Sequence, residues 1–261
     1  MKLSTPAVLA AALVSVLSGS PAAAQELHVN HRWKDCAFVI DPALTQDAWH
    51  QFVGELGQVA YVRPMTSARP LGGRRVEVAL LTSATLVDDS DDAWNDTFSH
   101  PDSTHYLTEG GGVIVPGLMV RTGVTDRLDV GAYYTKSINS NWGIVGAQVQ
   151  YNLLQDEHRN VAAAGRVSVT RLFGPEDLGL TVYGLDLLAS KDVSVFTPYA
   201  GVSGYVARGV ERTTKVDLDR ETVFGAQAMA GVAVRLSVVT VAAEAHMAKV
   251  PGYSVKLAFG S

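Results

Sequence analysis

Hydrophobic and polar residues alternate at every second position in the stretch GVTDRLDVGAYYTK. Leu128, Val130, Ala132 and Tyr134 share one parity, and the residues between them, beginning with Asp129, share the other. A period of two predicts a β-strand with two unlike faces, because successive side chains of a strand point to opposite sides. A strand of a soluble sandwich and a strand of a membrane barrel both fit this pattern.

Alternating segments of this kind follow one another from residue 74 to the C-terminus, separated by turn residues. Most are roughly ten residues long, which is the length that a tilted strand needs to cross a bilayer. We therefore predict an all-β fold over residues 74–261, a transmembrane antiparallel up-and-down β-barrel of about ten strands. Eight or twelve strands remain alternatives, because the alternation blurs between 180 and 188 and the stretch from 60 to 72 could also pair.

The polar parity of these segments carries Gly, Ser, Thr, Gln, Tyr and single charges. The water-facing side of a soluble sandwich is usually rich in Lys and Glu instead, so the composition favours a confined polar lumen. The predicted lumen-lining ionisable residues are Glu77, Asp129, Arg166, Asp186, Arg235, Glu244 and His246. Both charge signs are present, and a barrel of about ten strands is only slightly wider than one filled by side chains. We expect these groups to pair across a narrow, mostly closed lumen.

The three longest connections, 87–108, 172–179 and 209–221, fall on the same side of the predicted barrel. The turns on the other side are short. Outer-membrane barrels have this asymmetry, with long outer loops and short periplasmic turns. An even strand number also returns the C-terminus to the first strand, so that the sheet can close and leave no unpaired edge in lipid.

The N-terminus has the pattern of a secretory signal peptide over residues 1–24. Lys2 supplies a positive charge, 7–17 is an apolar run, and Ala22 and Ala24 occupy the small positions of a cleavage site. A short membrane anchor is the alternative, although the apolar run is too short to span a bilayer comfortably.

Residues 25–73 are predicted to be a periplasmic segment made of an amphipathic helix and a linker. Hydrophobic residues recur at helical spacing between 42 and 62, and Asp41 followed by Pro42 fits an N-cap and first helical position. The predicted apolar face consists of Trp49, Phe52, Val53, Leu56 and Val59 or Ala60. The helix could be an arm, a plug, or a cover over one barrel end.

The C-terminal stretch YSVKLAFGS places Tyr253, Val255, Leu257 and Phe259 on one face. These residues resemble the C-terminal strand signal that the outer-membrane barrel assembly machinery reads, although two residues follow the phenylalanine where such chains normally stop. The stretch GVTDRLDVGAYY resembles a periplasmic turn that enters a strand of a Gram-negative barrel. Over residues 74–261 the chain thus resembles proteobacterial outer-membrane β-barrel proteins that carry no assigned activity.

The resemblance implies a place in the bacterial cell outer membrane, in contact with outer-membrane lipid and lipopolysaccharide, and insertion by the barrel assembly machinery. We also expect a monomer. The formal net charge of −5, without a Lys/Arg cluster in the sequence, argues against a nucleic-acid partner. Cys36 is the single cysteine, so no internal disulfide is possible, and no cofactor is expected.

Barrel enzymes of the outer membrane need a histidine with a serine or aspartate partner near the outer rim. The candidates here are His246, beside Glu244, and the loop residues Ser99, His100, Asp102, Ser103 and His105. They match no catalytic signature, so we assign no catalytic residue and do not expect an enzyme.

Asp88, Asp89, Asp91 and Asp92 stand close together in the first predicted outer loop. Their carboxylate oxygens suit calcium, but the stretch lacks the ligand spacing and the glycine of an EF-hand loop. We therefore assign no metal site and expect a solvated acidic loop.

The sequence predicts a structural, interaction or small-ligand role for an outer-membrane barrel with a mostly closed lumen. Two alternatives stay open, a porin-like channel for small solutes and a lipid-modifying hydrolase.

Overall fold

The computed structural model describes residues 37–88, 90–99, 107–108, 112–136 and 140–260, so the expected signal peptide and residues 25–36 lie outside the described chain. Its elements are β1 (Ala37–Phe38), α2 (Gln46–Ala60), β2 (Val76–Thr85), α3 (Asp92–Asn95), β3 (Phe98–Ser99), β4 (Leu107–Thr108), β5 (Gly112–Gly123), β6 (Leu128–Lys136), β7 (Gly143–Asp156), β8 (Val161–Phe173), β9 (Leu178–Lys191), β10 (Phe196–Glu211), β11 (Glu221–Leu236), β12 (Val239–Met247) and β13 (Gly252–Gly260). Among these described residues, neither helix has the length and apolar character needed to cross a membrane.

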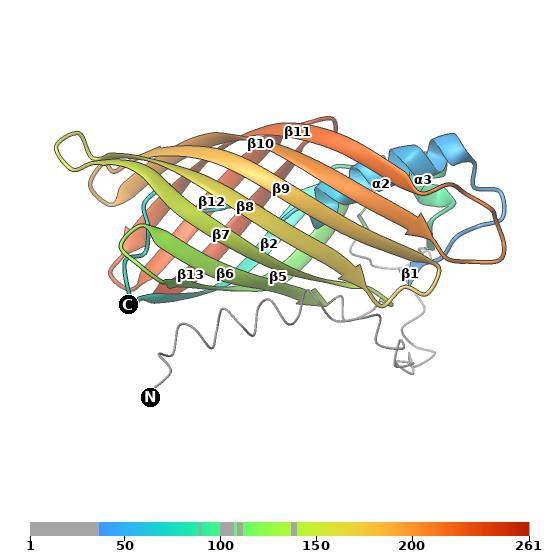
Figure 1. Ribbon diagram of the computed structural model, residues 1–261, viewed down its shortest axis with the longest axis horizontal. Coiled ribbons are helices and arrows are strands. Elements are labelled where there is room, and N and C mark those ends of the chain that lie inside the picture. The colour runs from blue at the N-terminus through green and yellow to red at the C-terminus, as the bar shows by residue number, and fades with distance from the viewer. Residues whose placement is uncertain (1–36, 89, 100–106, 109–111, 137–139, 261) are drawn as a thin grey trace.

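Strands β2 and β5 to β13 form one antiparallel barrel in which each strand pairs with the next along the chain. The first and last strands also pair, so the sheet closes: Leu80 of β2 lies opposite Leu257 of β13 and Leu118 of β5. The predicted ten-strand barrel is therefore confirmed, and the described residues 61–75 lie outside the strands. Figure 1 shows the tilted strands wrapping around a common axis.

The blurred alternation near 188 has a physical cause in β9. Leu185 and Leu187 face outward and are 57% and 55% exposed, as the alternation requires. Leu188 faces inward and packs with Ala68, a residue of the segment before the barrel. The inward position is apolar there because protein rather than water fills the lumen at that level.

Large apolar side chains project from the outer wall all around the barrel. Leu80, Val167 and Val202 are each more than half exposed, although they belong to strands with buried inner faces. A continuous apolar surface of this kind is unfavourable in water, whereas a bilayer requires it around a closed barrel.

The two ends of the barrel differ. One end carries the connections 86–111 and 212–220, and we call it the long-connection end; the other, the short-turn end, carries turns such as 124–127 and the C-terminus. Figure 1 shows α2 and α3 together at the end opposite the C-terminus. The prediction that the long connections lie on the same side of the barrel is therefore confirmed.

Helix α2 begins later than predicted. Its N-cap is Thr45, whose side chain accepts a hydrogen bond from Ala48 N at 3.3 Å. Asp41 is not the cap, because its carboxylate instead accepts from Ala43 N at 2.8 Å and forms a separate turn.

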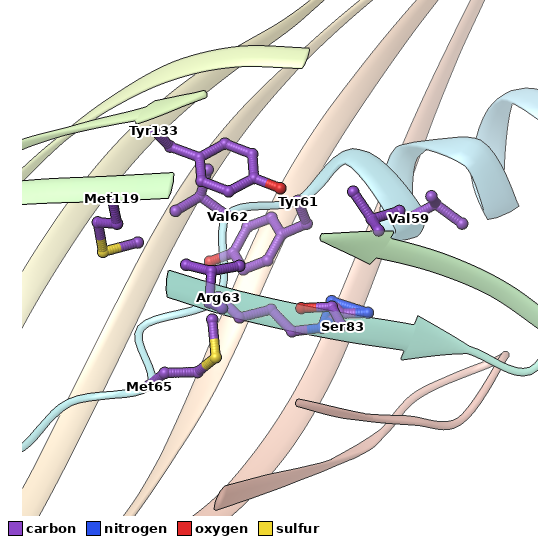
Figure 2. A pocket seen from close by; sticks show the side chains of 10 residues that line it. Val59, Tyr61, Val62, Arg63, Met65, Ser83, Met119 and Tyr133 are labelled. Atoms are coloured by element: carbon purple, nitrogen blue, oxygen red, sulfur yellow. The ribbon is translucent and has the colours of Figure 1, made fainter. Parts of the chain in front are cut away.

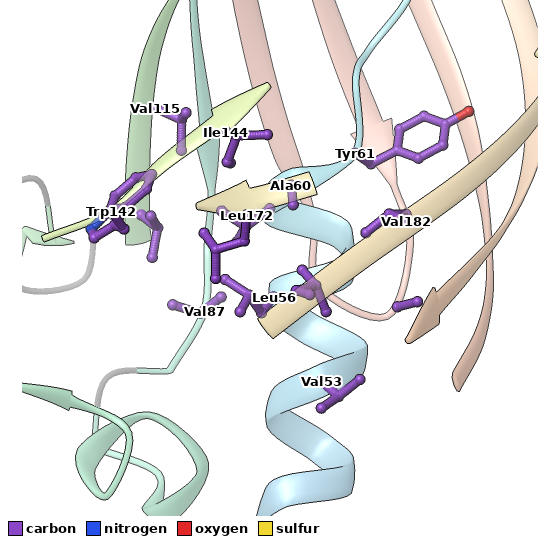
Figure 3. Packing of buried hydrophobic residues seen from close by; sticks show 14 of the residues in the cluster. Val53, Leu56, Ala60, Tyr61, Val87, Val115, Trp142, Ile144, Leu172 and Val182 are labelled. Carbon is purple, nitrogen blue, oxygen red and sulfur yellow. The ribbon is translucent and has the colours of Figure 1, made fainter. Parts of the chain in front are cut away.

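The helix lies inside the long-connection end rather than in a separate segment. Its apolar face packs against inward residues of the wall, and Figure 3 shows Leu56 and Ala60 near Leu172. The approach is close: a Cβ placed at Gly57 would lie 2.5 Å from Ala207 Cβ, and one at Gly209 would lie 2.3 Å from Val53 Cγ2. Only glycine allows these two contacts.

Residues 61–71 continue from the helix through the lumen to the short-turn end, where Leu71 N contacts Asp129 and the chain turns into β2. We call this stretch the threading segment. Gly72 and Arg74 have φ values of +88° and +70° in that turn. Of the arm, plug and cover alternatives, the contacts of 46–71 fit a plug, because the hydrophobic helix face and the polar coil both find their partners inside the barrel. The periplasmic placement of residues 25–73 stays a prediction.

Candidate functional site

The lumen is filled by α2 and the threading segment, and three groups of charged side chains hold that segment. In the first, Arg166 of β8 lies directly opposite Asp186 of β9, with Nε 2.7 Å from Oδ2. The remaining donors of the guanidinium bond Gln148 Oε1 at 2.6 Å and the carbonyl oxygen of Val62 at 2.6 Å. A cross-strand ion pair of the wall therefore also binds the backbone of the threading segment.

Asp186 is shared by further donors. The hydroxyl groups of Tyr61 and Ser203 each donate to Asp186 Oδ1 at 2.5 Å. The Tyr61 ring also lies beneath Arg166, whose Cζ is 5.7 Å from the ring centroid. Since Arg166 and Asp186 have fully buried side chains, the pair is stable only with such complete hydrogen bonding.

The second group lies towards the short-turn end. Arg121 contacts Asp129 at 2.9 Å and Glu77 at 3.5 Å, and Lys256 Nζ lies 3.1 Å from Glu77 Oε1. Both carboxylate oxygens of Asp129 accept from Leu71 N, at 3.1 and 3.0 Å. Two cations and two carboxylates thus balance one another around the end of the threading segment.

The third group contains the histidine singled out in the sequence. His246 Nδ1 lies 3.4 Å from Glu244 Oε1, and His246 Nε2 lies 3.0 Å from Ser254 Oγ, which donates to Ser83 Oγ at 2.9 Å. Glu244 Oε2 accepts from Met65 N at 3.0 Å. Serine, histidine and carboxylate follow the order of a catalytic triad. Glu244 and His246 are fully buried, however, and Glu244 contacts the threading segment through Met65 N.

Inward polar side chains satisfy the backbone of the threading segment. Gln150 Nε2 donates to the Ser67 carbonyl at 3.2 Å, Asn152 Nδ2 donates to the Ala68 carbonyl at 3.1 Å, and Ala68 N donates to Ser190 Oγ at 3.1 Å. An irregular backbone at membrane depth is tolerated when protein supplies these partners. The polar parity of the wall therefore serves as the binding surface for this coil.

A small cavity lies between the end of α2 and strands β2, β5 and β6. Figure 2 shows Tyr61, Arg63, Met65 and Tyr133 converging on it. Arg63 closes it on one side by donating to the Gln58 carbonyl at 3.2 Å and to Thr85 Oγ1 at 2.8 Å.

The predicted lumen residues are distributed as follows. The structure buries Glu77, Asp129, Arg166, Asp186, Glu244 and His246 inside the barrel. Arg235 has the inward parity of Ala233 but lies near the end of β11 and is exposed. Sequence reasoning missed Arg121 and Lys256, which supply the cations of the second group. Lys256 could have been found, because it stands between the outward Val255 and Leu257.

The predicted assembly-signal residues lie on the outer face of the closing strand β13. Tyr253, Val255, Leu257 and Phe259 are between 37% and 53% exposed. Their role in assembly stays a prediction.

The acidic loop is organised by local hydrogen bonds. Asp88 accepts from the hydroxyl and the N–H of Ser90, at 2.6 and 3.0 Å, which lowers the pKa of its carboxyl group. Asp91 caps α3 and accepts from Gln51 Nε2 at 2.7 Å, while Asp92 is the first residue of that helix. Partial burial, with the nearby carboxylates, raises the pKa of Asp96.

The described residues bring together no cluster of three or more metal-ligating side chains. Asp89 and the loop candidates His100, Asp102, Ser103 and His105 lie outside the described residues. Ser99 is placed only by its backbone, which pairs with Ala37 in the small sheet of β1 and β3.

No family model and no curated protein matches this chain. Among solved structures, an outer-membrane channel from Pseudomonas putida F1 is similar over 77% of this chain and 100% of its own, with 10% identity and a TM-score of 0.47. The translocator domain of the autotransporter NalP from Neisseria meningitidis covers 72% and 88%, with 11% identity and a TM-score of 0.40. LpxR from Salmonella typhimurium covers 70% and 99%, with 10% identity and a TM-score of 0.37. Likeness at this level assigns no activity to this chain.

The physical argument for location rests on the barrel itself. Every barrel strand pairs on both sides, and the outer wall carries the apolar side chains that lipid requires. The chain is thus a closed ten-strand β-barrel of the bacterial outer-membrane type, with its own N-terminal residues 46–71 inside the lumen.

Proposed function

We propose that this protein is a non-conducting outer-membrane barrel with a structural or interaction role, exerted at its long-connection end. The observation that supports it is the lumen filled by α2 and the threading segment. In a pore the lumenal charges would face water and select ions. Here Arg166, Asp186 and Glu77 contact other side chains or the threading segment instead.

Hydrogen bonds hold the connections at the long-connection end in place. Phe38 N donates to Asn141 Oδ1 at 3.0 Å, and Ile40 N donates to Asp177 Oδ2 at 3.0 Å. Trp49 Nε1 donates to the Asp219 carbonyl at 3.1 Å. The residues before the barrel therefore join three different connections, and this favours one rigid binding surface over independent mobile loops.

Planar-bilayer conductance tests the proposal. We expect no steady conductance from the full chain and ohmic conductance from a variant that lacks residues 46–71, because deletion empties the lumen. Heat-dependent migration on a detergent gel would verify that both barrels are closed. Steady conductance of the full chain would overturn the proposal.

A small-solute channel is the first alternative, and the irregular backbone of the threading segment favours it, since a coil held by side chains is more readily displaced than a strand. It predicts conductance of the full chain that changes when the charge at Arg166 or Glu244 is reversed. If the barrel is closed, the full chain should show no conductance, with or without these charge reversals.

A lipid-modifying hydrolase is the second alternative, favoured by the contacts of His246 with Glu244 and Ser254. It predicts release of fatty acid from phospholipid or lipopolysaccharide, which is lost on His246→Ala. The closed barrel predicts no release by the full chain, because the threading segment covers these groups.

A further inference from the structure

Two arginines flank one threonine on the outer wall near the long-connection end. Arg171 of β8 and Arg208 of β10 both lie directly opposite Thr181 of β9. All three have the outward parity, and both arginines are exposed. Neighbouring strands are about 4.8 Å apart, so the two arginine backbones lie about 10 Å from each other across the threonine.

A third arginine reaches the same place from the β10–β11 connection. A Cβ built at Gly179, two residues before Thr181, would lie 2.4 Å from Arg212 Nη2. The guanidinium of Arg212 therefore rests on β9 beside Gly179. Arg171 is far in the sequence from Arg208 and Arg212, and the strand register brings it beside them.

The cluster has no anionic partner within the described chain. The ion pairs of the described residues involve other cations, and the nearby Asp177 is occupied by Lys215 Nζ at 3.1 Å and by Ile40 N at 3.0 Å. Arg208 Cζ lies 5.9 Å from the Tyr183 ring centroid, which fixes it against the wall. Three unpaired guanidinium groups on a chain of net charge −5 form a site for an external anion.

An apolar hollow lies next to the cluster, towards the middle of the barrel. Val206 stands opposite both Tyr183 and Phe224, and Phe224 is 78% exposed. Two residues before Val206, Gly204 lies opposite Leu185. A Cβ placed at Gly204 would meet no atom closer than Gly225 O, at 4.0 Å, so there is open space above this glycine. The hollow between these side chains faces the lipid.

We propose that Arg171, Thr181, Arg208 and Arg212, together with the hollow at Gly204, bind a phosphorylated lipid. The guanidinium groups hold its phosphate, and the hollow holds one of its acyl chains. Long connections of outer-membrane barrels lie on the outer side, where the leaflet is built of lipopolysaccharide. The occupant is therefore the phosphorylated lipid A portion of lipopolysaccharide, and this inference does not depend on whether the lumen is closed.

The test is binding of lipid A to the full chain in detergent micelles, followed by native mass spectrometry. Arg171→Gln, Arg208→Gln and Arg212→Gln are combined in one variant. The matched control combines Arg127→Gln, Arg159→Gln and Lys191→Gln, which remove three exposed cations at the short-turn end. Heat-dependent gel migration verifies folding of each variant.

We expect the cluster variant to bind lipid A at least about tenfold more weakly than the wild type, and the control variant to bind it equally well. Dephosphorylated lipid A should bind the wild type as weakly as lipid A binds the cluster variant. Gly204→Leu should weaken lipid A binding without changing the charge, because it fills the hollow.

Three outcomes would overturn the proposal. Equal binding by the wild type and the cluster variant would show that the arginines do not contribute. If the wild type bound lipid A and dephosphorylated lipid A equally well, the phosphate would not be recognised and only the hollow would bind the lipid. Equal or tighter binding of phosphatidylglycerol would identify a phospholipid as the occupant in place of lipid A.

Discussion

Helix α2 and the threading segment fill the same lumen, but the wall contacts them in different ways. The helix is held by apolar packing, because Val53 and Leu56 belong to one buried hydrophobic cluster with Val182 of β9. The threading segment is held by charges and hydrogen bonds, of which the contact of Arg166 with Val62 is an example.

The difference follows from backbone structure. A helix satisfies its own N–H and C=O groups, so it can lie against an apolar wall, where burial of hydrophobic surface stabilises it. A coil has no such internal bonds, and its wall must supply polar partners. The barrel therefore has an apolar inner face at the long-connection end and a polar one below it. Four substitutions test this difference between the helix and the coil.

The largest effect is expected where the coil binds the buried ion pair. Arg166→Met leaves Asp186 as an uncompensated buried charge and should lower the free energy of unfolding by about 3–5 kcal/mol. Urea unfolding in lipid vesicles, followed by tryptophan fluorescence, measures it. The double variant with Asp186→Asn should recover much of the loss, since neither charge then remains. A loss below about 1 kcal/mol in the single variant would show that the pair does not hold the lumen together.

Apolar packing of the helix should give the next largest effect. Leu56→Ala removes a side chain that is 1% exposed and should cost about 2–5 kcal/mol in the same measurement. The cost should not change with salt, because no charge is involved. A cost that falls in high salt would mean that the helix, like the coil, is held by electrostatic contacts.

Close approach of the helix to the wall is tested by two glycines. Gly57→Ala places a methyl group 2.5 Å from Ala207 Cβ and should destabilise by about 1–3 kcal/mol, offset by up to about 1 kcal/mol of helix propensity. Gly54→Ala is the control, because its nearest neighbour, Val223 Cγ1 at 3.2 Å, can move. Equal stability of both variants would contradict the tight contact.

The smallest effect concerns the start of the helix. Thr45→Ala removes the side chain that caps α2 and should cost about 1 kcal/mol. Asp41→Ala should leave helix stability unchanged, since Asp41 caps a separate turn. A larger effect at Asp41 than at Thr45 would restore the boundary predicted from the sequence.

The barrel could be predicted from the sequence because its signal is local. A period of two identifies a strand and its two faces, and this rule places Asp129, Arg166 and Asp186 inside without any information about their partners. The same rule fails where a residue lies near a strand end, as for Arg235, which has the inward parity but is exposed.

The sequence could not decide between an arm, a plug and a cover for the helix, because the choice depends on contacts between distant parts of the chain. The apolar face of α2 shows that the helix is buried, but not what buries it. The polar wall around Ala68 looks the same in sequence whether it faces water or a coil. The blurred alternation at Leu188 is a trace of this packing, but in the sequence alone it indicates only an uncertain strand number.

The most direct test of a filled lumen is a disulfide between the threading segment and the wall. Ala68→Cys and Ser190→Cys, with Cys36→Ser to remove the native thiol, join two positions whose backbone N and side-chain oxygen are 3.1 Å apart. A filled lumen predicts near-complete crosslinking in isolated outer membranes, with unchanged heat-dependent migration. Two free thiols that both react with a water-soluble reagent, in a barrel that still shows that migration, would contradict it.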